Sequence, residues 1–120
     1  MPTDPTSLPR LDIATAIENM AGMADLYAEA GGIFLTDSVA QTESLEQALA
    51  SNDMVTVRRA AHTIKGMAAS LGAERLRQQA YELEHACIDG QRAIVVAGLP
   101  ALKLELEAVN TELADYLNTH

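Results

Sequence analysis

Apolar residues recur at alternating spacings of four and three through residues 54–71, and this spacing predicts an amphipathic helix. The stripe consists of Val57, Ala61, Ile64, Ala68 and Leu71. Residues 74–88 carry a similar stripe, formed by Leu76, Ala80, Leu83 and Cys87. Residues 99–118 carry a third, formed by Leu102, Leu106, Val109, Leu113 and Leu117. Each stripe is expected to face the other helices in a common core.

Two further helices are predicted nearer the N-terminus. A short one covers residues 12–20, with Ile13, Ile17 and Met20 on one face. A longer one covers residues 23–50, and its apolar positions include Leu26, Ile33, Val39, Leu45 and Leu49. Gly31 and Gly32 fall inside it, where each costs about 1 kcal/mol relative to Ala. They indicate a bend, a break or a close contact with another helix, and the sequence does not choose among these.

Polar residues and glycines mark the ends of the predicted helices. Asp53 is placed as an N-cap, and Gly72 as a left-handed residue that ends the helix over residues 54–71. Pro100 is expected in the first turn of the last helix, where a missing N–H is harmless. The sequence does not decide the structure of residues 91–98, because they could also form a first, kinked part of that helix. No alternating pattern of strand length interrupts the helices.

The fold class predicted from these elements is all-α, an antiparallel up-down four-helix bundle with a short additional N-terminal helix. Residues 1–10, rich in Pro and Thr, are predicted to be a flexible arm, and residues 11–120 a single bundle domain. The chain has no Trp and one Phe, so Leu, Ala, Met and Val must fill the core. Such residues suit helices packed on helices.

Charge and cysteine content narrow the function classes. The net charge of −9 argues against binding of nucleic acid or of an anionic membrane surface. Cys87 is the only cysteine, so an intramolecular disulfide is excluded and Cys87 is expected to be a small core residue. No signal peptide and no run of the ~20 apolar residues of a membrane span is found. We therefore expect a cytoplasmic protein, either free-standing, as Met1 favours, or cut from a larger kinase.

The candidate chemistry centres on His62, which follows the stripe residue Ala61 and should lie at the edge of the buried face. Lys65, three residues on, could place its ammonium beside a group attached to the imidazole. A phosphoryl group there would carry a charge of roughly −1.5 to −2 at neutral pH, and the ammonium could offset that charge. Gly66, four residues on, removes side-chain bulk where a partner would approach. Arg58, Arg59 and Ala69 are expected on the same face.

Glu84 is the predicted partner of the imidazole. If the chain turns at residues 72–73, then His62 and Glu84 each lie about 15–16 Å along their helices, at similar heights. A carboxylate that accepts a hydrogen bond from the imidazole Nδ1–H would leave Nε2 as the free nucleophile. Taken alone, each of these residues could be an ordinary surface side chain, and it is their combined spacing that favours a site.

These residues resemble the signature of the histidine-phosphotransfer (HPt) family. The resemblance lies in Ala61-His62-Thr63-Ile64-Lys65-Gly66, then Leu71-Gly72-Ala73, then Leu83-Glu84. It implies phosphorylation of His62 at Nε2, assistance from Lys65, and orientation of the ring by Glu84. A second histidine that some related domains carry at position 81 is replaced here by Tyr81.

The resemblance also implies the partners. These are the receiver domains of a hybrid histidine kinase and of a response regulator, and the receiver supplies Mg²⁺, so that the chain itself needs no cofactor. The docking face is predicted to include Arg58, Arg59, Gly66, Ala69 and Tyr81. The chain would be a monomeric phosphocarrier without kinase activity of its own.

Two alternatives remain at this point. One is a helical adaptor without phosphoryl chemistry. The other is a helical metal protein, which would use His62, His85 and His120. The sequence contains one Glu-x-x-His pair, Glu82 with His85, but it lacks the second pair that a di-iron bundle requires.

Overall fold

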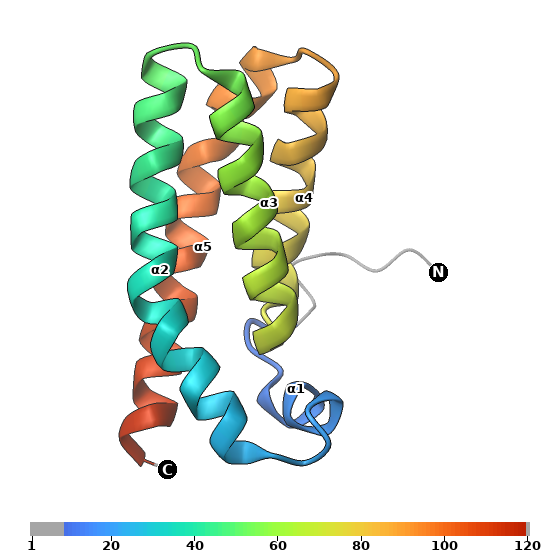
Figure 1. Ribbon diagram of the computed structural model, residues 1–120, viewed down its shortest axis with the longest axis vertical. Coiled ribbons are helices and arrows are strands. Elements are labelled where there is room, and N and C mark those ends of the chain that lie inside the picture. The colour runs from blue at the N-terminus through green and yellow to red at the C-terminus, as the bar shows by residue number, and fades with distance from the viewer. Residues whose placement is uncertain (1–8, 120) are drawn as a thin grey trace.

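The computed structural model describes residues 9–119, and these residues form helices and no strands (Figure 1). The helices are α1 (Ile13–Asn19), α2 (Ala24–Ala50), α3 (Met54–Leu71), α4 (Glu74–Ile88) and α5 (Arg92–Thr119). Helices α2 to α5 run up and down beside one another, and α1 lies across one end (Figure 1). The predicted all-α, antiparallel up-down four-helix bundle with a short additional N-terminal helix is confirmed.

Most of the predicted stripes form the core. All five stripe residues of α3 are buried, as are the first three of α4 and the first four of α5. Cys87 and Leu117, the last residues of their stripes, are half-buried and pack against the core. Ile13, Ile17 and Met20 of α1 also pack against it. The spacing of apolar residues therefore determined the buried faces of these helices.

The prediction for α2 was partly wrong. Leu45 and Leu49 are buried, but Leu26, Ile33 and Val39 are 43%, 55% and 45% exposed. The residues buried instead are Tyr27, Gly31, Phe34, Ser38, Thr42 and Ala48. Polar groups on this face are satisfied internally: the Tyr27 hydroxyl donates to the Leu71 carbonyl at 2.9 Å, and the Thr42 hydroxyl donates to the Ser38 carbonyl at 2.8 Å. Hydropathy alone misses a buried face that carries such bonded groups.

The two glycines of α2 have different surroundings. The helix is continuous from residue 24 to residue 50, so a break, one of the three possibilities that the sequence left open, is excluded. A Cβ added at Gly31 would lie 3.1 Å from Leu113 Cδ1, whereas one at Gly32 would meet nothing within 4 Å. Gly31 therefore permits close packing of α2 against α5.

The start of α5 differs from the prediction. The helix begins at Arg92 instead of residue 99, so Pro100 lies inside it and not in its first turn. Of residues 91–98, which the sequence left undecided, residues 92–98 are thus the first part of this helix. Arg92 anchors it by donating to the Leu49 carbonyl and the Asn52 side chain, and Val95 is fully buried. Pro100 withholds an N–H from the carbonyl of Val96, and Val96 is on the exposed side, where water can replace the bond.

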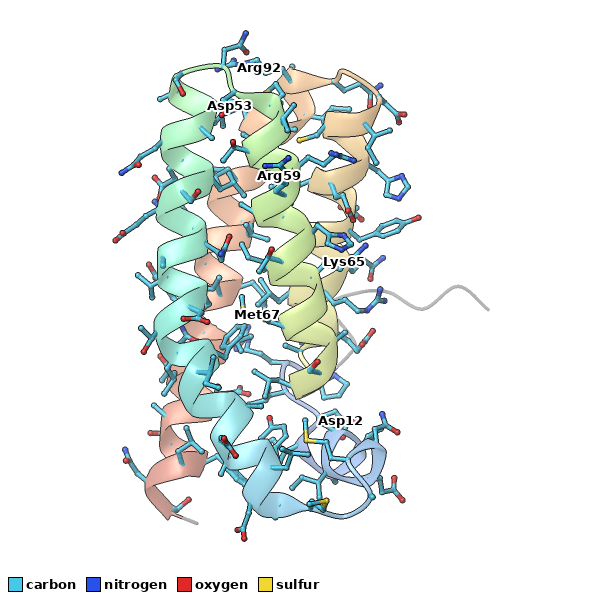
Figure 2. All side chains as sticks on the ribbon, viewed as in Figure 1. Asp12, Asp53, Arg59, Lys65, Met67 and Arg92 are labelled. Carbon is cyan, nitrogen blue, oxygen red and sulfur yellow. The ribbon has the colours of Figure 1, made fainter. Side chains whose placement is uncertain are left out.

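The capping predictions were correct and fix the two ends of the bundle. The Asp53 side chain accepts from the Thr56 amide at 3.2 Å, and Gly72 ends α3 in the left-handed conformation at φ +81°. The Gly72 carbonyl accepts from the Asp12 amide at 2.9 Å, which ties the start of α1 to the α3–α4 turn. Asp53 and Arg92 lie at one end of the bundle and Asp12 at the other (Figure 2).

Gly72→Ala is expected to destabilise the fold more than Gly90→Ala. Both positions have positive φ, but a Cβ at Gly72 would clash with the backbone carbonyl of Asp12, whereas one at Gly90 meets nothing within 4 Å. We expect a loss of about 1 kcal/mol for Gly90→Ala and at least about 2 kcal/mol for Gly72→Ala, measured by urea unfolding. Equal losses would show that the contact with Asp12 contributes nothing.

The segment predicted as a flexible arm, residues 1–10, lies mostly outside the described residues. Of its last residues, Arg10 donates from Nε to Glu105 Oε2 at 2.8 Å. Glu105 is buried, and the guanidinium supplies the charge that its carboxylate needs there.

Candidate functional site

His62 stands on the outer face of α3. Its side chain is 65% exposed, although its neighbour Ala61 is fully buried. The backbone is therefore held by the core while the ring meets solvent, as the position at the edge of the stripe predicts. The helix gives the ring a fixed base, and the hairpin between α3 and α4 brings a partner to it.

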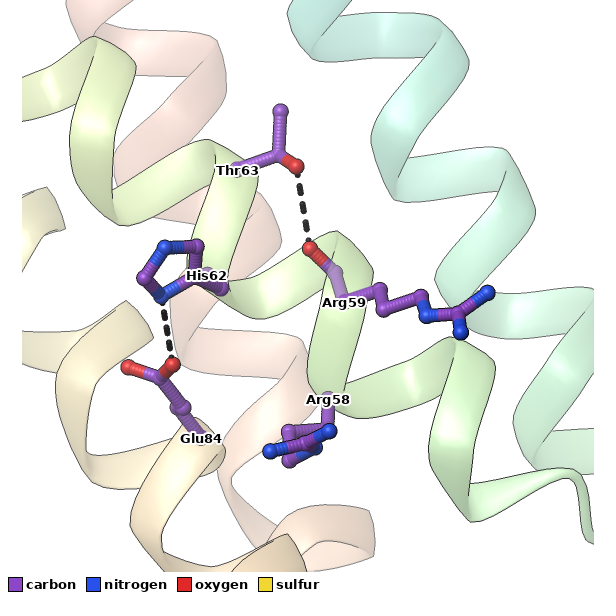
Figure 3. A pocket seen from close by; sticks show the side chains of 5 residues that line it. All are labelled: Arg58, Arg59, His62, Thr63 and Glu84. Atoms are coloured by element: carbon purple, nitrogen blue, oxygen red, sulfur yellow. Dashed lines mark hydrogen bonds and ion pairs between the residues drawn. The ribbon is translucent and has the colours of Figure 1, made fainter.

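The partner is Glu84, which α4 places beside the ring. His62 Nδ1 lies 2.6 Å from Glu84 Oε2 (Figure 3). Glu84 is 8% exposed and lies next to the buried stripe residue Leu83. The two residues are at matching heights because the α3–α4 turn lies between them at nearly equal distances along the chain. The sequence-based pairing of these two residues is thus present in the structure.

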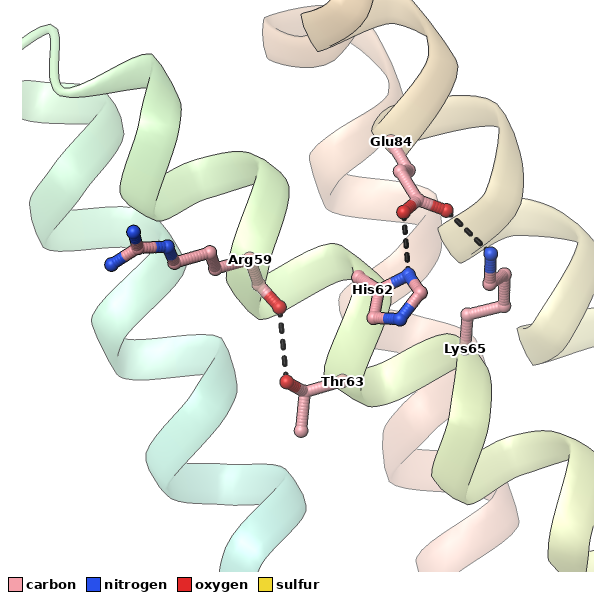
Figure 4. Close-up of polar contacts among 5 residues, drawn as sticks. All are labelled: Arg59, His62, Thr63, Lys65 and Glu84. Carbon is pink, nitrogen blue, oxygen red and sulfur yellow. Dashed lines mark hydrogen bonds and ion pairs between the residues drawn. The ribbon is translucent and has the colours of Figure 1, made fainter.

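Lys65 is the third member of the cluster. Its Nζ lies 2.6 Å from the other carboxylate oxygen, Glu84 Oε1, so Glu84 bridges the imidazole and the ammonium (Figure 4). The Lys65 side chain is 25% exposed. In this state the ammonium is bound to Glu84 and is not directed at Nε2 of His62, a detail that the spacing in the sequence did not specify.

The electrostatics of Glu84 determine the tautomer of the ring. Burial by itself raises the pKa of this carboxyl, but hydrogen bonds from Lys65 and His62, together with their charges, outweigh burial and lower the pKa below 4.5. Glu84 is therefore ionised at neutral pH and can only accept hydrogen bonds. Nδ1 of His62 must then carry a proton, and in the neutral ring Nε2 presents a lone pair toward solvent.

The predicted docking residues surround the ring to different degrees. Gly66 and Ala69 are exposed, and a Cβ added at Gly66 would meet nothing within 4 Å. A surface hollow of about 410 Å³ lies beside the ring, and it is lined by Arg58, Arg59, His62, Thr63 and Glu84. Tyr81 is 44% exposed, its ring centroid lies 5.8 Å from Lys65 Nζ, and its ring contacts that of His85.

Arg59 differs from the expectation, and Thr63 adds to it. Although Arg59 is among the residues that line the hollow, its guanidinium is directed away from His62 and toward α2 (Figures 3 and 4). The Thr63 hydroxyl donates to the Arg59 carbonyl at 3.0 Å and also borders the hollow. Sequence reasoning did not include Thr63 among the site residues. Its place next to His62 in the motif was the available signal.

Comparison with known proteins identifies the family. The family model for the Hpt domain matches residues 31–112 of the chain. The chain belongs to the Hpt domain family. A role in phosphotransfer within two-component signalling follows from this membership, since the family consists of phosphocarriers.

Two solved structures are similar to this Hpt domain. Histidine-containing phosphotransfer protein B (HptB) from Pseudomonas aeruginosa PAO1 has a TM-score of 0.86 and 26% identity, over 95% of this chain and 99% of that chain. The HPT domain of the Hpt sensor hybrid histidine kinase from Shewanella has a TM-score of 0.84 and 19% identity, over 92% of this chain and 96% of that chain. The search of curated proteins gave no significant match.

The other reactive side chains of the Hpt domain lie apart from the cluster. His85 is exposed on α4, and His120 is outside the described residues. Burial raises the pKa of the half-buried Cys87 thiol above 9.0, so it is protonated at neutral pH. Within residues 9–119, no three His, Cys, Asp or Glu side chains are grouped to hold a metal ion. In the same residues, each helix is too short or too polar to span a bilayer.

Glu84→Gln is expected to reduce stability in a pH-dependent way. Folding lowers the pKa of Glu84, so its contribution is present above the ordinary value of 4.5 and is lost as the pH falls through the lower folded value. At pH 7 we expect a loss of about 1–2 kcal/mol, because Lys65 is left without its carboxylate, and a smaller difference from wild type at about pH 3.

The matched control for this substitution is Glu82→Gln, an exposed residue on the same helix. Urea unfolding at several pH values measures both variants. A loss for Glu84→Gln that stays constant with pH, or one equal to that of Glu82→Gln, would show that the bridge to His62 and Lys65 does not stabilise the fold.

Proposed function

We propose that His62 accepts a phosphoryl group from the aspartyl phosphate of a receiver domain, or from a histidine kinase, and passes it to the receiver Asp of a response regulator. The observation that carries the proposal is the 2.6 Å pairing of His62 Nδ1 with the buried Glu84 on a ring that is 65% exposed. This pairing directs the lone pair of Nε2 outward, where a partner can approach it.

The transfer step balances with these groups alone and the partner's phosphate. The Nε2 lone pair attacks phosphorus, a new N–P bond forms, and the P–O bond to the aspartyl carboxylate breaks, so that the carboxylate leaves with the electron pair. The Nδ1 proton stays between His62 and Glu84, which stabilises the charge that develops on the ring. In the second transfer a receiver carboxylate attacks phosphorus, and the electron pair of the N–P bond returns to Nε2.

Lys65 and the receiver offset the charge of the transferred group. Phosphoryl transfer depends mainly on positioning and electrostatic stabilisation. We propose that the Lys65 ammonium, held on Glu84 in the resting state, interacts with the phosphoryl oxygens once Nε2 is phosphorylated. Mg²⁺ belongs to the receiver in this proposal, and the Hpt domain contributes no cofactor.

The charge distribution supports receiver docking at α3 and α4. These two helices carry five Lys or Arg residues and three Asp or Glu residues, whereas α2 and α5 carry two and nine. A face richer in cations suits an acidic partner pocket and speeds encounter. We propose that Arg58, Gly66, Ala69 and Tyr81 form this face around His62, with Arg59 at its edge. The domain would act as a monomeric phosphocarrier in the cytoplasm.

The experiment that tests the proposal measures transfer from phosphorylated receiver domains. A panel of receivers is labelled with ³²P and incubated with the purified Hpt domain. We expect the domain to acquire label that is labile in acid and stable in alkali, as phosphohistidine is, and to return it to a second receiver. The proposal is wrong if neither a receiver nor a histidine kinase of the source organism transfers label to the domain, or if the label is alkali-labile.

Lys65→Ala is expected to lower the rate of transfer to His62 by about tenfold, because about 1.4 kcal/mol of charge stabilisation is removed from the transition state. Arg77→Ala is the control: Arg77 is a cation on α4 that is paired with Glu74 at 2.9 Å, and it should leave the rate unchanged. Rapid-quench measurement of phosphohistidine decides between them. A wild-type rate for Lys65→Ala removes Lys65 from the site.

A further inference from the structure

The largest hollow described on the surface of the domain lies between α2 and α5. It has a volume of about 560 Å³ and is lined by Glu46, Leu49, Val96, Leu99, Pro100, Lys103, Leu104 and Glu107. A smaller hollow of about 180 Å³ shares Glu46, Lys103 and Glu107 with it and extends it past Val39 and Glu43. We call the two together the α2/α5 groove. The α2 residues that line the groove lie between Val39 and Leu49, farther along the helix than Gly31, where α2 packs closely against Leu113 of α5.

The floor of the groove is apolar and open to solvent. Leu104 is 68% exposed, more than any other large hydrophobic residue described, and Val96 and Val39 are 44% and 45% exposed. Pro100 and the half-buried Leu99 lie between Val96 and Leu104 along α5. Contiguous exposed apolar surface of this kind marks interaction sites more often than scattered single residues do.

The rim of the groove is acidic. Lys103, its single cation, is paired with Glu46 at 3.1 Å. The carboxylates of Glu43 and Glu107 have no ion-pair partner among residues 9–119. Helix α2 contains five acidic residues and no Lys or Arg. A ligand of this groove would therefore combine apolar and basic groups.

The shape of the groove suits a helix. From Val96 to Glu107 it follows α5 for about 16 Å, the length of about three helical turns. An amphipathic helix lays its apolar face into such a groove and places its polar residues along the rim. A second copy of this chain is a poor occupant, because it would bring another acidic surface against the rim.

We propose that the α2/α5 groove binds a basic amphipathic helix of a partner protein. The groove lies on the side of the bundle opposite the α3–α4 pair that carries His62, because α2 and α5 are neighbours there and α3 and α4 are neighbours on the other side (Figure 1). A receiver at His62 and a helix in the groove can therefore be bound together. The inference rests on different residues from the proposed phosphotransfer, and either can fail without the other.

The test uses a synthetic peptide of about 14 residues with Leu on one helical face and Lys on the other, labelled with a fluorophore. Its binding is measured by anisotropy at physiological salt, and ¹⁵N chemical shifts of the domain locate it. We expect saturable binding with shifts along α2 and α5, and unchanged transfer from a receiver to His62 in the presence of peptide. A control peptide with Glu in place of Lys should not bind.

Matched variants separate the groove from general attraction between a basic peptide and an acidic protein. Leu104→Ser should weaken binding by about tenfold, and Glu107→Gln by about threefold, because a buried apolar contact and one ion pair are removed. The controls are Ile88→Ser, which replaces an apolar residue that is 57% exposed at the end of α4, and Glu82→Gln, and both should bind like wild type.

Three results would overturn the proposal. The first is the absence of saturable binding at physiological salt. The second is equal affinity in Leu104→Ser and Ile88→Ser, which would mean that net charge alone attracts the peptide. The third is a dimer in sedimentation velocity that Leu104→Ser dissociates, which would mean that a second copy occupies the groove.

Discussion

His62→Gln is expected to reduce the phosphoryl label on the Hpt domain to background in every receiver reaction. Gln has a similar length and can still donate to the Glu84 carboxylate, and the hydrogen bond from Lys65 to Glu84 does not involve this position. It has no ring nitrogen with an available lone pair, so no N–P bond can form. Because the side chain at this position is 65% exposed, the free energy of unfolding should change by less than about 0.5 kcal/mol.

His85→Gln provides the control for this experiment. His85 is a second exposed histidine, on α4, and its ring contacts Tyr81 beside the site. It has no carboxylate that fixes its tautomer among its described contacts. We expect His85→Gln to accept label at the wild-type rate. If label survives in His62→Gln and disappears in His85→Gln, the phosphoryl group is carried by His85 on α4, and our proposal is wrong.

Gly66→Gln is expected to lower the rate of transfer from a receiver by about a hundredfold, equivalent to about 2.7 kcal/mol of lost docking or positioning. The reason is that the new side chain would stand on the docking face four residues after His62, where a Cβ now meets nothing within 4 Å. The helix itself should gain up to about 0.5–1 kcal/mol in stability, since Gln has the higher helix propensity.

A small phosphodonor such as phosphoramidate distinguishes docking from chemistry. Gly66→Gln should accept phosphoryl groups from it at the wild-type rate, because Nε2 stays accessible to a small molecule. Gly32→Gln is the matched variant: it is also an exposed glycine inside a helix with nothing within 4 Å of its Cβ, but it lies on α2. If both variants slow receiver transfer equally, Gly66 has no special place on the docking face.

The sequence alone was enough to predict those helices whose buried faces consist of apolar side chains. In α3, α4 and the second half of α5, apolar side chains recur at helical spacing, and the buried positions follow from that spacing. The caps at Asp53 and Gly72 were also predictable, because each depends on a local property of one residue. The pairing of His62 with Glu84 was predictable for a different reason: a short turn joins their helices, and the residue count sets the distance along each helix.

The buried face of α2 depended on the tertiary structure. Thr42 is buried with its hydroxyl bound to the Ser38 carbonyl one turn earlier on α2, and Val39 stays exposed beside the α2/α5 groove. The Ser38 hydroxyl, in contrast, accepts from the Asn110 side chain on α5. A window of sequence cannot show that a polar group will find its partner on a distant helix. The early start of α5 has a similar origin, because Arg92 gains its partners only when the end of α2 lies beside it.

For the candidate site, too, some features followed from the sequence and others only from the tertiary structure. Residue type and spacing along α3 and α4 determined that an imidazole, an ammonium and a carboxylate would meet on one face. The packing of α3 against α4 decided that Glu84 would be buried and ionised between the other two, that Lys65 would rest on Glu84, and that Arg59 would turn toward α2. Spacing along a helix fixes the direction in which a side chain leaves the backbone, but its final contacts depend on which charged groups the neighbouring helices bring within reach.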